Sequence, residues 1–557
     1  MFPPPSRHPE FSLRRDGIWI FVLALLFGLY WTVTSRTQPF LTTGDMGRDL
    51  YAFWMTHQGY RPYRDYWWQY GPVMPYYFSF FFQAAGAGLA SVRIGLGLLF
   101  FLCALFSFRT LRVLVSSVPA FLASLAFLSL DIGFVPGSAG LINITHTFNH
   151  FGTYPFLLLA VGSLWKYFLT RKPRWIYAGA AAIAGMSAVK IHAGLTSCFA
   201  FFLAILAEEG FRVFRDRKKI QLPRLHLGLA AAVWASLVFT IYAPFFRGLS
   251  WEWIDRCFTI STGKAFMEDR YTVLQNLKHL VLRFTVWDRG RLFWLAGFSG
   301  IGFLGFLGMK NLEQDRKPFF IKAYFSLLLF GVNAIDYFVD GNIHRVDFWF
   351  FPLWVLVAGL SLEALKTLLP SGSRISLALL SFCLLLVLPV LNLREALGWQ
   401  VPGRYLDFPN GKVFMGGDME SVNVIQKGSA FIRDHTRPTE RILALPYDPL
   451  YCFLAGRRHA VRELWFGRAA LITPREEAGI IQAVEAQKVP LVILSNQAEI
   501  PGFGFGYFGR THCQKLAEYL TGHYQEVKTF GSWDIRNPNR HSIKILMRKL
   551  DLPAENR

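Results

Sequence analysis

The most informative stretch of this sequence for the fold is residues 42–77, TTGDMGRDLYAFWMTHQGYRPYRDYWWQYGPVMPYY. An apolar run begins before it at Ile18 and continues to about Thr34. Arg7, Arg14 and Arg15 precede that run, and it carries no small-x-small cleavage site, so we predict a retained membrane-spanning helix with a cytoplasmic N-terminus. The stretch 42–77 is too charged for lipid and is expected within a first outer loop, residues 36–90.

Further apolar runs follow along the chain. The 557 residues are 53% hydrophobic and 17% aromatic, and the runs are about 18–22 residues long, enough to cross a hydrocarbon core of roughly 30 Å. We predict about eleven membrane-spanning helices, at about 18–35, 91–108, 117–133, 153–169, 175–189, 193–207, 226–246, 292–309, 319–338, 348–365 and 375–392. Residues 76–88 are apolar but short, which is typical of a helix lying at the membrane interface.

The positive charges test this topology. The formal charge of +21 comes mainly from short Lys/Arg clusters between apolar runs, with no single basic stripe, so nucleic-acid binding is not expected. Every even-numbered span ends at a basic site, namely Arg109, Lys172, Lys218, Lys317 and Arg374. By the positive-inside rule these sites are cytoplasmic, and an odd number of spans then places residue 393 onward on the outer side.

The C-terminal tail alternates helical and strand patterns. Helices are expected at 421–435, 474–487 and 511–523, and strands at 441–446, 490–495, 525–535 and 541–547. The predicted fold class is therefore an α-helical polytopic membrane protein, N-in and C-out, with a C-terminal soluble α/β domain. Its parts are a transmembrane domain at 1–392 and an outer domain at 393–557. Cys452 and Cys513 could pair, although two distant cysteines are weak grounds for a disulfide.

Two carboxylates in the first outer loop are candidates for chemistry. Asp45 and Asp49 are four residues apart, so on a helix both would share one face, and Gly44 permits a tight turn before the helix. A carboxylate there can act as general base for a hydroxyl or bind a divalent ion that bridges a phosphate. The alternative is structural: a helix-capping Asp45 and a surface ion pair of Asp49 with Arg48 or Arg64.

The loop resembles a known class of membrane enzymes. The GD-x-x-x-D arrangement at residue 44 onward, followed by RPYRDYWWQYGP, resembles the GT-C class of integral-membrane glycosyltransferases, such as protein O-mannosyltransferases and lipid A aminoarabinose transferases. The resemblance extends to GAAAIAGMSAVKIHAGL at 179–195 and to AFIRDHTRPTERILALPYDPLYCFLAGRR at 430–458. In that family an acidic residue of the first outer loop is the catalytic base. The resemblance thus implies Asp45 as the base, with Asp49 as runner-up or helper.

Basic residues could hold the phosphate of a lipid-linked donor. Lys190 ends a Gly/Ala-rich helix, where a lysine either snorkels to the interface or pairs with an anion such as a lipid phosphate. His192 could share that site. Arg345 has a planar fork suited to phosphate, and the resemblance implies a basic residue at this place, although an ion pair with Asp347 is the alternative.

Four further residues are candidates for contact with the sugar or acceptor, namely Tyr70, Gln69, His344 and Asn149. Neither His344 nor the group Asn143, His146, Asn149 and His150 shows the spacing of metal ligands. The aromatic run 66–70 could anchor the loop at headgroup level or stack against a sugar or isoprenoid, and anchoring is the simpler interpretation.

The expected function follows from the resemblance. It implies an inverting glycosyltransferase of a bacterial inner membrane, with a polyprenyl-phosphate-linked sugar as donor and a hydroxyl of a lipid, glycan or protein as acceptor. A divalent metal ion, with Asp45 as one ligand, remains an option, because members of the family differ in this respect. The alternatives are a multispan transporter or flippase of a lipid-linked substrate, which interior charges also fit, and a non-catalytic envelope assembly protein.

Overall fold

The structure is a computed structural model. It describes residues 12–34, 44–129, 148–216, 224–259, 312, 316–331, 346–368, 403–416, 419–467, 470, 472–496, 507–533 and 541–551. Two of the expected spans, 292–309 and 375–392, lie outside these ranges. The count of about eleven membrane-spanning helices therefore stays a prediction.

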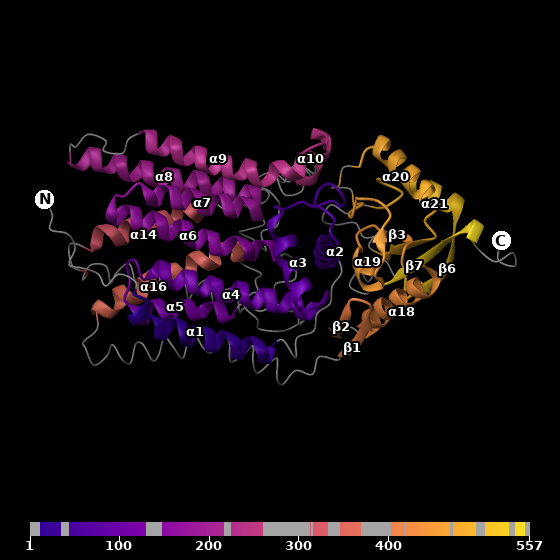
Figure 1. Ribbon diagram of the computed structural model, residues 1–557, viewed down its shortest axis with the longest axis horizontal. Helices are drawn as coiled ribbons and strands as arrows, with labels where there is room; N and C mark the ends of the chain where they lie inside the picture. Colours follow the sequence, from indigo (N-terminus) through magenta and orange to yellow (C-terminus); the bar gives the residue numbers. More distant parts are fainter. Residues whose placement is uncertain are drawn as a thin grey trace.

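The N-terminal two-thirds form a helical bundle. Its helices are α1 (Leu13–Thr34), α4 (Leu89–Leu111), α5 (Ser117–Leu125), α6 (Phe148–Thr170), α7 (Arg174–Val189), α8 (Ile191–Asp216), α9 (Arg224–Phe246), α14 (Lys317–Phe330) and α16 (Val346–Leu368). Figure 1 shows these helices side by side with similar axis directions, and the β-sheet of the C-terminal part stands at one end of the bundle.

Four helical segments among the described residues are long and apolar enough to cross a membrane, namely Arg14–Thr32, Ala90–Leu111, Ile191–Phe214 and Leu225–Phe246. Large apolar side chains on the outside of these helices are exposed, including Phe21, Phe199 and Phe239 at 64%, 61% and 73%. Only 11% of the apolar window of α9 is buried inside the protein. Such a surface is stable against lipid and costly against water, so it supports a multi-pass membrane protein.

Ion pairs join the helices at the end of the bundle away from the sheet. Arg112 pairs with Asp16 at 3.1 Å, Arg171 with Glu209 at 2.9 Å, and Arg316 with Glu363 at 3.2 Å. These contacts bring together the ends of α1 and α4, of α6 and α8, and of α14 and α16. The predicted cytoplasmic sites Arg109, Lys172 and Lys317 lie at these same helix ends, as the positive-inside rule requires.

The C-terminal part contains a mixed five-stranded sheet of order β4-β3-β5-β7-β6. The strands are β3 (Arg441–Leu445), β4 (Arg458–His459), β5 (Leu491–Ser495), β6 (Tyr524–Phe530) and β7 (Ile543–Arg548). Strand β3 pairs in parallel with β4 and β5, and β7 pairs antiparallel with β5 and β6. The accompanying helices are α18 (Met419–His435), α19 (Leu450–Ala455), α20 (Pro474–Ala486) and α21 (Gln514–His523).

The expected helices and strands of the tail occur within a few residues of their predicted bounds. The hairpin β1 (Gly403–Phe408) and β2 (Gly411–Gly416) was not predicted, although Asn410-Gly411 beside its turn is a hairpin signal. Cys452 and Cys513 are both buried free thiols, so the option that they pair is wrong. The placement of this part in water outside the membrane stays a prediction.

The first loop lies between the bundle and the C-terminal part (Figure 1). It contributes α2 (Asp45–His57) and α3 (Val73–Ala85), and α2 packs along α19. A Cβ on Gly47 would lie only 2.7 Å from Cβ of Leu450, so this close approach requires glycine. Because α2 is buried between the two parts, its polar side chains must find partners within the protein.

Candidate functional site

The candidate site is built on the first turn of α2. Gly44 has φ 64° and ψ −121°, a conformation that a residue with a side chain rarely adopts, and α2 begins directly after it at Asp45. The helix start predicted from the Gly44–Asp45 pair is therefore confirmed. This turn places the carboxylates of Asp45 and Asp49 on one face of α2.

A buried arginine lies between the two carboxylates. Nη1 of Arg48 donates to Oδ1 of Asp45 at 3.0 Å. Nε and Nη2 of Arg48 both donate to Oδ1 of Asp49, at 2.9 and 2.6 Å. The side chains of Arg48 and Asp49 are 1% and 0% exposed, whereas that of Asp45 is 22% exposed. The expected ion pair between Asp49 and Arg48 is therefore present, but it is buried and does not lie on the surface.

A tyrosine of the C-terminal part completes this group. The hydroxyl of Tyr447 accepts a bond of 2.8 Å from Nη1 of Arg48 and donates one of 2.5 Å to Oδ1 of Asp45. Burial raises the pKa of Tyr447 above its ordinary value, so the phenol stays protonated and acts as a donor. Oδ1 of Asp45 is thus held by one residue of the first loop and one of the C-terminal part. Sequence analysis missed both Arg48 and Tyr447 as site residues.

Asn149 lies on the other side of Asp49. It is buried at the start of α6, and its amide Nδ2 donates to Oδ2 of Asp49 at 3.4 Å. Both oxygens of Asp49 therefore have partners within the protein. Asn149, predicted to contact sugar or acceptor, is brought into the group through Asp49.

Two rings of the aromatic run 66–70 lie against Arg48. The centres of the Tyr70 and Trp68 rings lie 5.3 and 5.7 Å from Cζ of Arg48, and Gln69 is 5% exposed. All five residues of the run are buried in the protein. Anchoring of this run at lipid headgroups is therefore wrong, and the rings of Trp68 and Tyr70 lie against the guanidinium instead.

Lys190 comes directly after a residue that contacts the loop following Tyr70. Helix α7 ends at Val189, Lys190 is extended, and α8 begins at Ile191, which confirms the predicted break. The backbone N–H of Gly71 donates to the carbonyl of Val189 at 2.8 Å, and a Cβ on Gly71 would lie 1.9 Å from the carbonyl oxygen of Ala188. Glycine at 71 thus allows the loop to pack directly against the end of α7. Lys190 and His192 are 3% and 9% exposed.

Several predicted site residues cannot be placed. Arg345 and His344, proposed for donor phosphate and sugar, lie outside the described residues, as do Asn143 and His146. Of the predicted site residues, the structure brings together Asp45, Asp49, Asn149 and Tyr70. Gln69 is buried in the same run as Tyr70, and Lys190 follows Val189, whose carbonyl accepts a bond from Gly71.

A divalent metal does not fit the two carboxylates as they are arranged. The space between Asp45 and Asp49 holds the guanidinium of Arg48, which already binds an oxygen of each. Among the described residues no group of three or more His, Cys, Asp or Glu side chains gathers to hold an ion. A metal at this position would have to displace a buried cation.

Asp49 is expected to make folding stability depend on pH. Burial raises the pKa of Asp49 to about 7, although Arg48 acts in the opposite direction. The unfolded carboxyl has a pKa near 3.8, so the folded state binds more protons between about pH 4 and pH 7, and stability falls as pH rises through that window. Melting temperatures across this range should therefore decline less steeply in Asp49→Asn than in the wild type. An equal decline would contradict the prediction, and Asp434→Asn, at an exposed position of α18, is the control.

Comparison with known proteins supports the fold. The sequence matches no protein-family model and no curated protein. The structure is similar to ArnT from Cupriavidus metallidurans bound to undecaprenyl phosphate, with 13% identity, 96% of this chain and 99% of that chain covered, and a TM-score of 0.54.

Two further solved structures match with lower scores. The archaeal oligosaccharyltransferase AglB from Archaeoglobus fulgidus, in complex with an inhibitory peptide and a dolichol-phosphate, has 13% identity, 98% and 76% coverage of this and that chain, and a TM-score of 0.48. The arabinofuranosyltransferase AftD from Mycobacteria has 14% identity, 97% and 40% coverage, and a TM-score of 0.46. The match to ArnT confirms the architecture expected from the resemblance, a multi-pass membrane protein with the GT-C fold.

Proposed function

We propose that this protein is an inverting glycosyltransferase that moves a sugar from a polyprenyl-phosphate donor to a hydroxyl acceptor at the outer face of a bacterial inner membrane. The shared fold with ArnT, solved with undecaprenyl phosphate bound, supports this class of donor. The observation that carries the proposal is the partly exposed carboxylate of Asp45, oriented by a buried arginine and tyrosine.

Asp45 is better suited than Asp49 to act as the general base. A base must reach the proton that it removes, and Asp49 is 0% exposed with both oxygens engaged inside the protein. Asp45 is 22% exposed, and the bonds from Arg48 and Tyr447 to Oδ1 fix the direction of its carboxylate. In this assignment Asp49 holds Arg48 in place, and Arg48 orients the base.

The proposed reaction is a single displacement at the anomeric carbon. The acceptor oxygen attacks this carbon as its proton passes to Asp45, and the bond from the anomeric carbon to the phosphate oxygen breaks with its electron pair on the phosphate. Attack from the face opposite the leaving group inverts the configuration. Phosphate is a good leaving group, so stabilising its growing charge is sufficient and no acid is required.

We assign the leaving phosphate to Lys190, with His192 and Arg345 as further donors. Lys190 follows directly after the contact between Val189 and Gly71, and Gly71 in turn follows Tyr70, whose ring lies against Arg48. A series of contacts, from Val189 to Gly71 and from Tyr70 through Arg48 to Asp45, therefore connects the backbone beside Lys190 with the proposed base. Tyr70 and Gln69 remain proposed to contact the sugar or the acceptor, which can be a lipid, a glycan or a protein.

The proposal is tested by cleavage of the donor. Purified protein in nanodiscs is incubated with a panel of labelled polyprenyl-phosphate sugars, and release of free polyprenyl phosphate is measured with Asp45→Asn as the inactive reference. A glycosyltransferase releases polyprenyl phosphate at a rate that depends on Asp45. A transporter or flippase would move the donor without cleaving it, and an envelope assembly protein would do neither; either result contradicts the proposal.

A further inference from the structure

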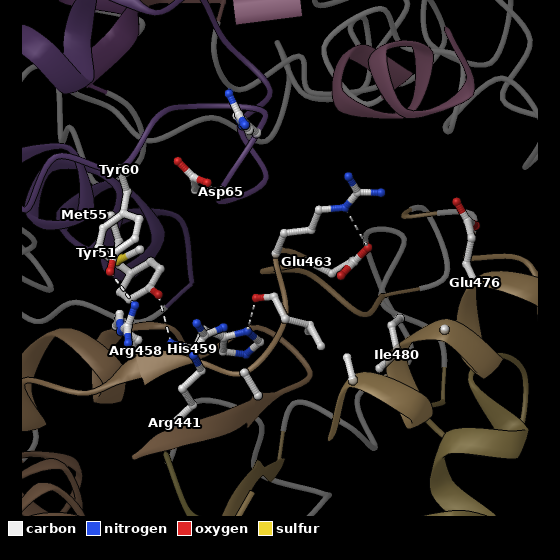
Figure 2. Close-up of a pocket in the computed structure, with 16 residues that line it drawn as sticks. Tyr51, Met55, Tyr60, Asp65, Arg441, Arg458, His459, Glu463, Glu476 and Ile480 are labelled. Atoms are coloured by element: carbon white, nitrogen blue, oxygen red, sulfur yellow. Dashed lines mark hydrogen bonds and ion pairs between the residues drawn. The ribbon is translucent and has the colours of Figure 1, made fainter. Parts of the chain in front are cut away.

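A cavity lies between the first loop and the C-terminal part. Its volume is about 500 Å³, within the range of about 300–1,000 Å³ typical of small-molecule sites. Its lining comes from α2, from the loop that follows α2, from β3, from β4 and the loop 460–463 after it, and from α20. Figure 2 shows Tyr51, Tyr60 and Arg458 close together on one side, with Glu463 and Glu476 on the other. We refer to it as the interface pocket.

The pocket carries positive charge that carboxylates among the described residues neutralise only in part. Four arginines line it, namely Arg64, Arg441, Arg458 and Arg462, together with three carboxylates, namely Asp65, Glu463 and Glu476. Arg256, which is not part of the lining, forms ion pairs with both Glu463 and Glu476. Within the part of the chain that the structure describes, Arg64, Arg441 and Arg458 form no ion pair.

Two of these arginines are placed directly beside each other. Arg441 on β3 and Arg458 on β4 are register partners in parallel strands, so their side chains start from one face of the sheet. Like charges at such positions repel, and an anion between them removes the repulsion. Two planar guanidinium groups that have no carboxylate partner among the residues the structure describes match the several oxygens of a phosphate or carboxylate.

The remaining walls suit a sugar. The hydroxyl of Tyr60 accepts a bond from Nη1 of Arg458, and its ring centre lies 5.4 Å from Cζ of that arginine. Tyr60 is partly exposed to the pocket, and Met55 and Ile480 supply apolar surface. A partly exposed aromatic ring beside the guanidinium group of Arg458 offers a stacking surface next to an anion site.

The pocket is separate from the site around Asp45. Tyr51 and Met55 are six and ten residues after Asp45 on the same helix, which corresponds to about 9 and 15 Å along its axis. A ligand in the pocket therefore cannot react there with a donor held beside Asp45. It can hold a remote part of a molecule whose hydroxyl reaches Asp45.

We propose that the interface pocket binds a phosphate- or carboxylate-bearing saccharide through Arg441, Arg458 and Tyr60, and that this saccharide belongs to the acceptor. The role as acceptor rests on the proposed function, whereas the binding itself does not. The acceptor is then an anionic glycan or glycolipid. The anionic group sits in the pocket and the reacting hydroxyl lies toward Asp45.

The test is calorimetric titration of the purified full-length protein. The probes are a panel of hexose and disaccharide phosphates and hexuronates, each matched with its neutral sugar, together with inorganic phosphate. We expect at least one anionic sugar to bind about tenfold or more tightly than its neutral counterpart and than inorganic phosphate. Equal binding of the neutral sugar, equal binding of inorganic phosphate, or no binding across the panel would overturn the proposal.

Substitutions of the pocket arginines test whether the anionic sugar binds in the interface pocket. Arg441→Gln should weaken binding about tenfold and Arg441→Gln/Arg458→Gln about a hundredfold, whereas Arg441→Lys, which keeps the charge, should lose less. Arg475→Gln removes the same charge at an exposed position of α20 outside the lining and serves as control. Unchanged affinity in the double variant, with an unchanged melting temperature, would overturn the assignment.

Two further comparisons separate the possible outcomes. Nanodiscs containing phosphatidylglycerol should not displace the anionic sugar; displacement would assign the pocket to lipid headgroups and overturn the proposal. Binding of an anionic sugar by a protein that does not cleave any donor would refute the proposed function and leave the pocket in place. Donor cleavage without such binding would refute only the pocket.

Discussion

Asp45→Asn is expected to lower the rate of sugar transfer by a factor of about 10²–10⁴, the usual contribution of a general base. The amide cannot accept the acceptor proton, but its oxygen can still accept the bonds from Arg48 and Tyr447. Because Arg48 also keeps its pair with Asp49, the fold should be retained. The measurement is the initial rate of transfer, taken together with the melting temperature of the purified variant.

Two further variants serve as a partial rescue and a control for this prediction. Asp45→Glu restores a carboxylate on a longer side chain and should recover part of the rate, because the group is present but displaced. Asp434→Asn removes a carboxylate at an exposed position and should leave transfer unchanged. If Asp45→Asn kept more than a tenth of the wild-type rate, Asp45 would not be the base.

Local sequence signals were sufficient to predict where the site begins. A glycine before Asp45 and a lysine at the end of a Gly/Ala-rich run mark a helix start and a helix break, and the structure has both. These signals act over a few residues, because a positive φ favours glycine and a polar side chain ends an apolar run. Basic residues at alternating helix ends likewise predict which way the helices cross the membrane, and this orientation stays a prediction.

The partners of Asp45 could not be predicted in the same way. Arg48 and Tyr447 are 399 positions apart, and nothing in the residues around Tyr447 indicates which buried groups it contacts. The paired arginines of the interface pocket depend on β4, a strand of two residues that is too short to show a pattern. Such contacts arise from the docking of the C-terminal part onto α2.

The aromatic run 66–70 shows why composition alone misled. Trp and Tyr are enriched both at membrane interfaces and in cores where their polar atoms find partners. Here Nε1 of Trp68 donates to the carbonyl of Gly71 at 2.9 Å, and the hydroxyl groups of Tyr66 and Thr56 share a bond of 2.6 Å. These internal partners allow the run to be buried, and only the tertiary structure reveals them.

Arg48→Met should cause the largest loss of stability among single changes at this site. Removing one member of a buried ion pair typically costs about 3–5 kcal/mol, because the remaining charge is left uncompensated. Asp49 is 0% exposed and would be left without the cation that it shares with Asp45. The free energy of unfolding in mixed detergent and the melting temperature should both fall. The fall should be larger at pH 8 than at pH 6, because Asp49 would have to remain protonated.

The double variant Arg48→Met/Asp49→Asn tests whether the loss of transfer in Arg48→Met is a consequence of its lower stability. Neutralising the stranded carboxylate should restore more than half of the lost stability, because replacing a whole buried pair by neutral groups often costs little. Transfer should stay low in the double variant, since Asp45 has lost the guanidinium that fixes its direction. Arg475→Met, at an exposed site, is the control for loss of an arginine. Recovery of transfer along with stability would mean that Arg48 serves only the fold, and the role of Arg48 in orienting the base would have to be withdrawn.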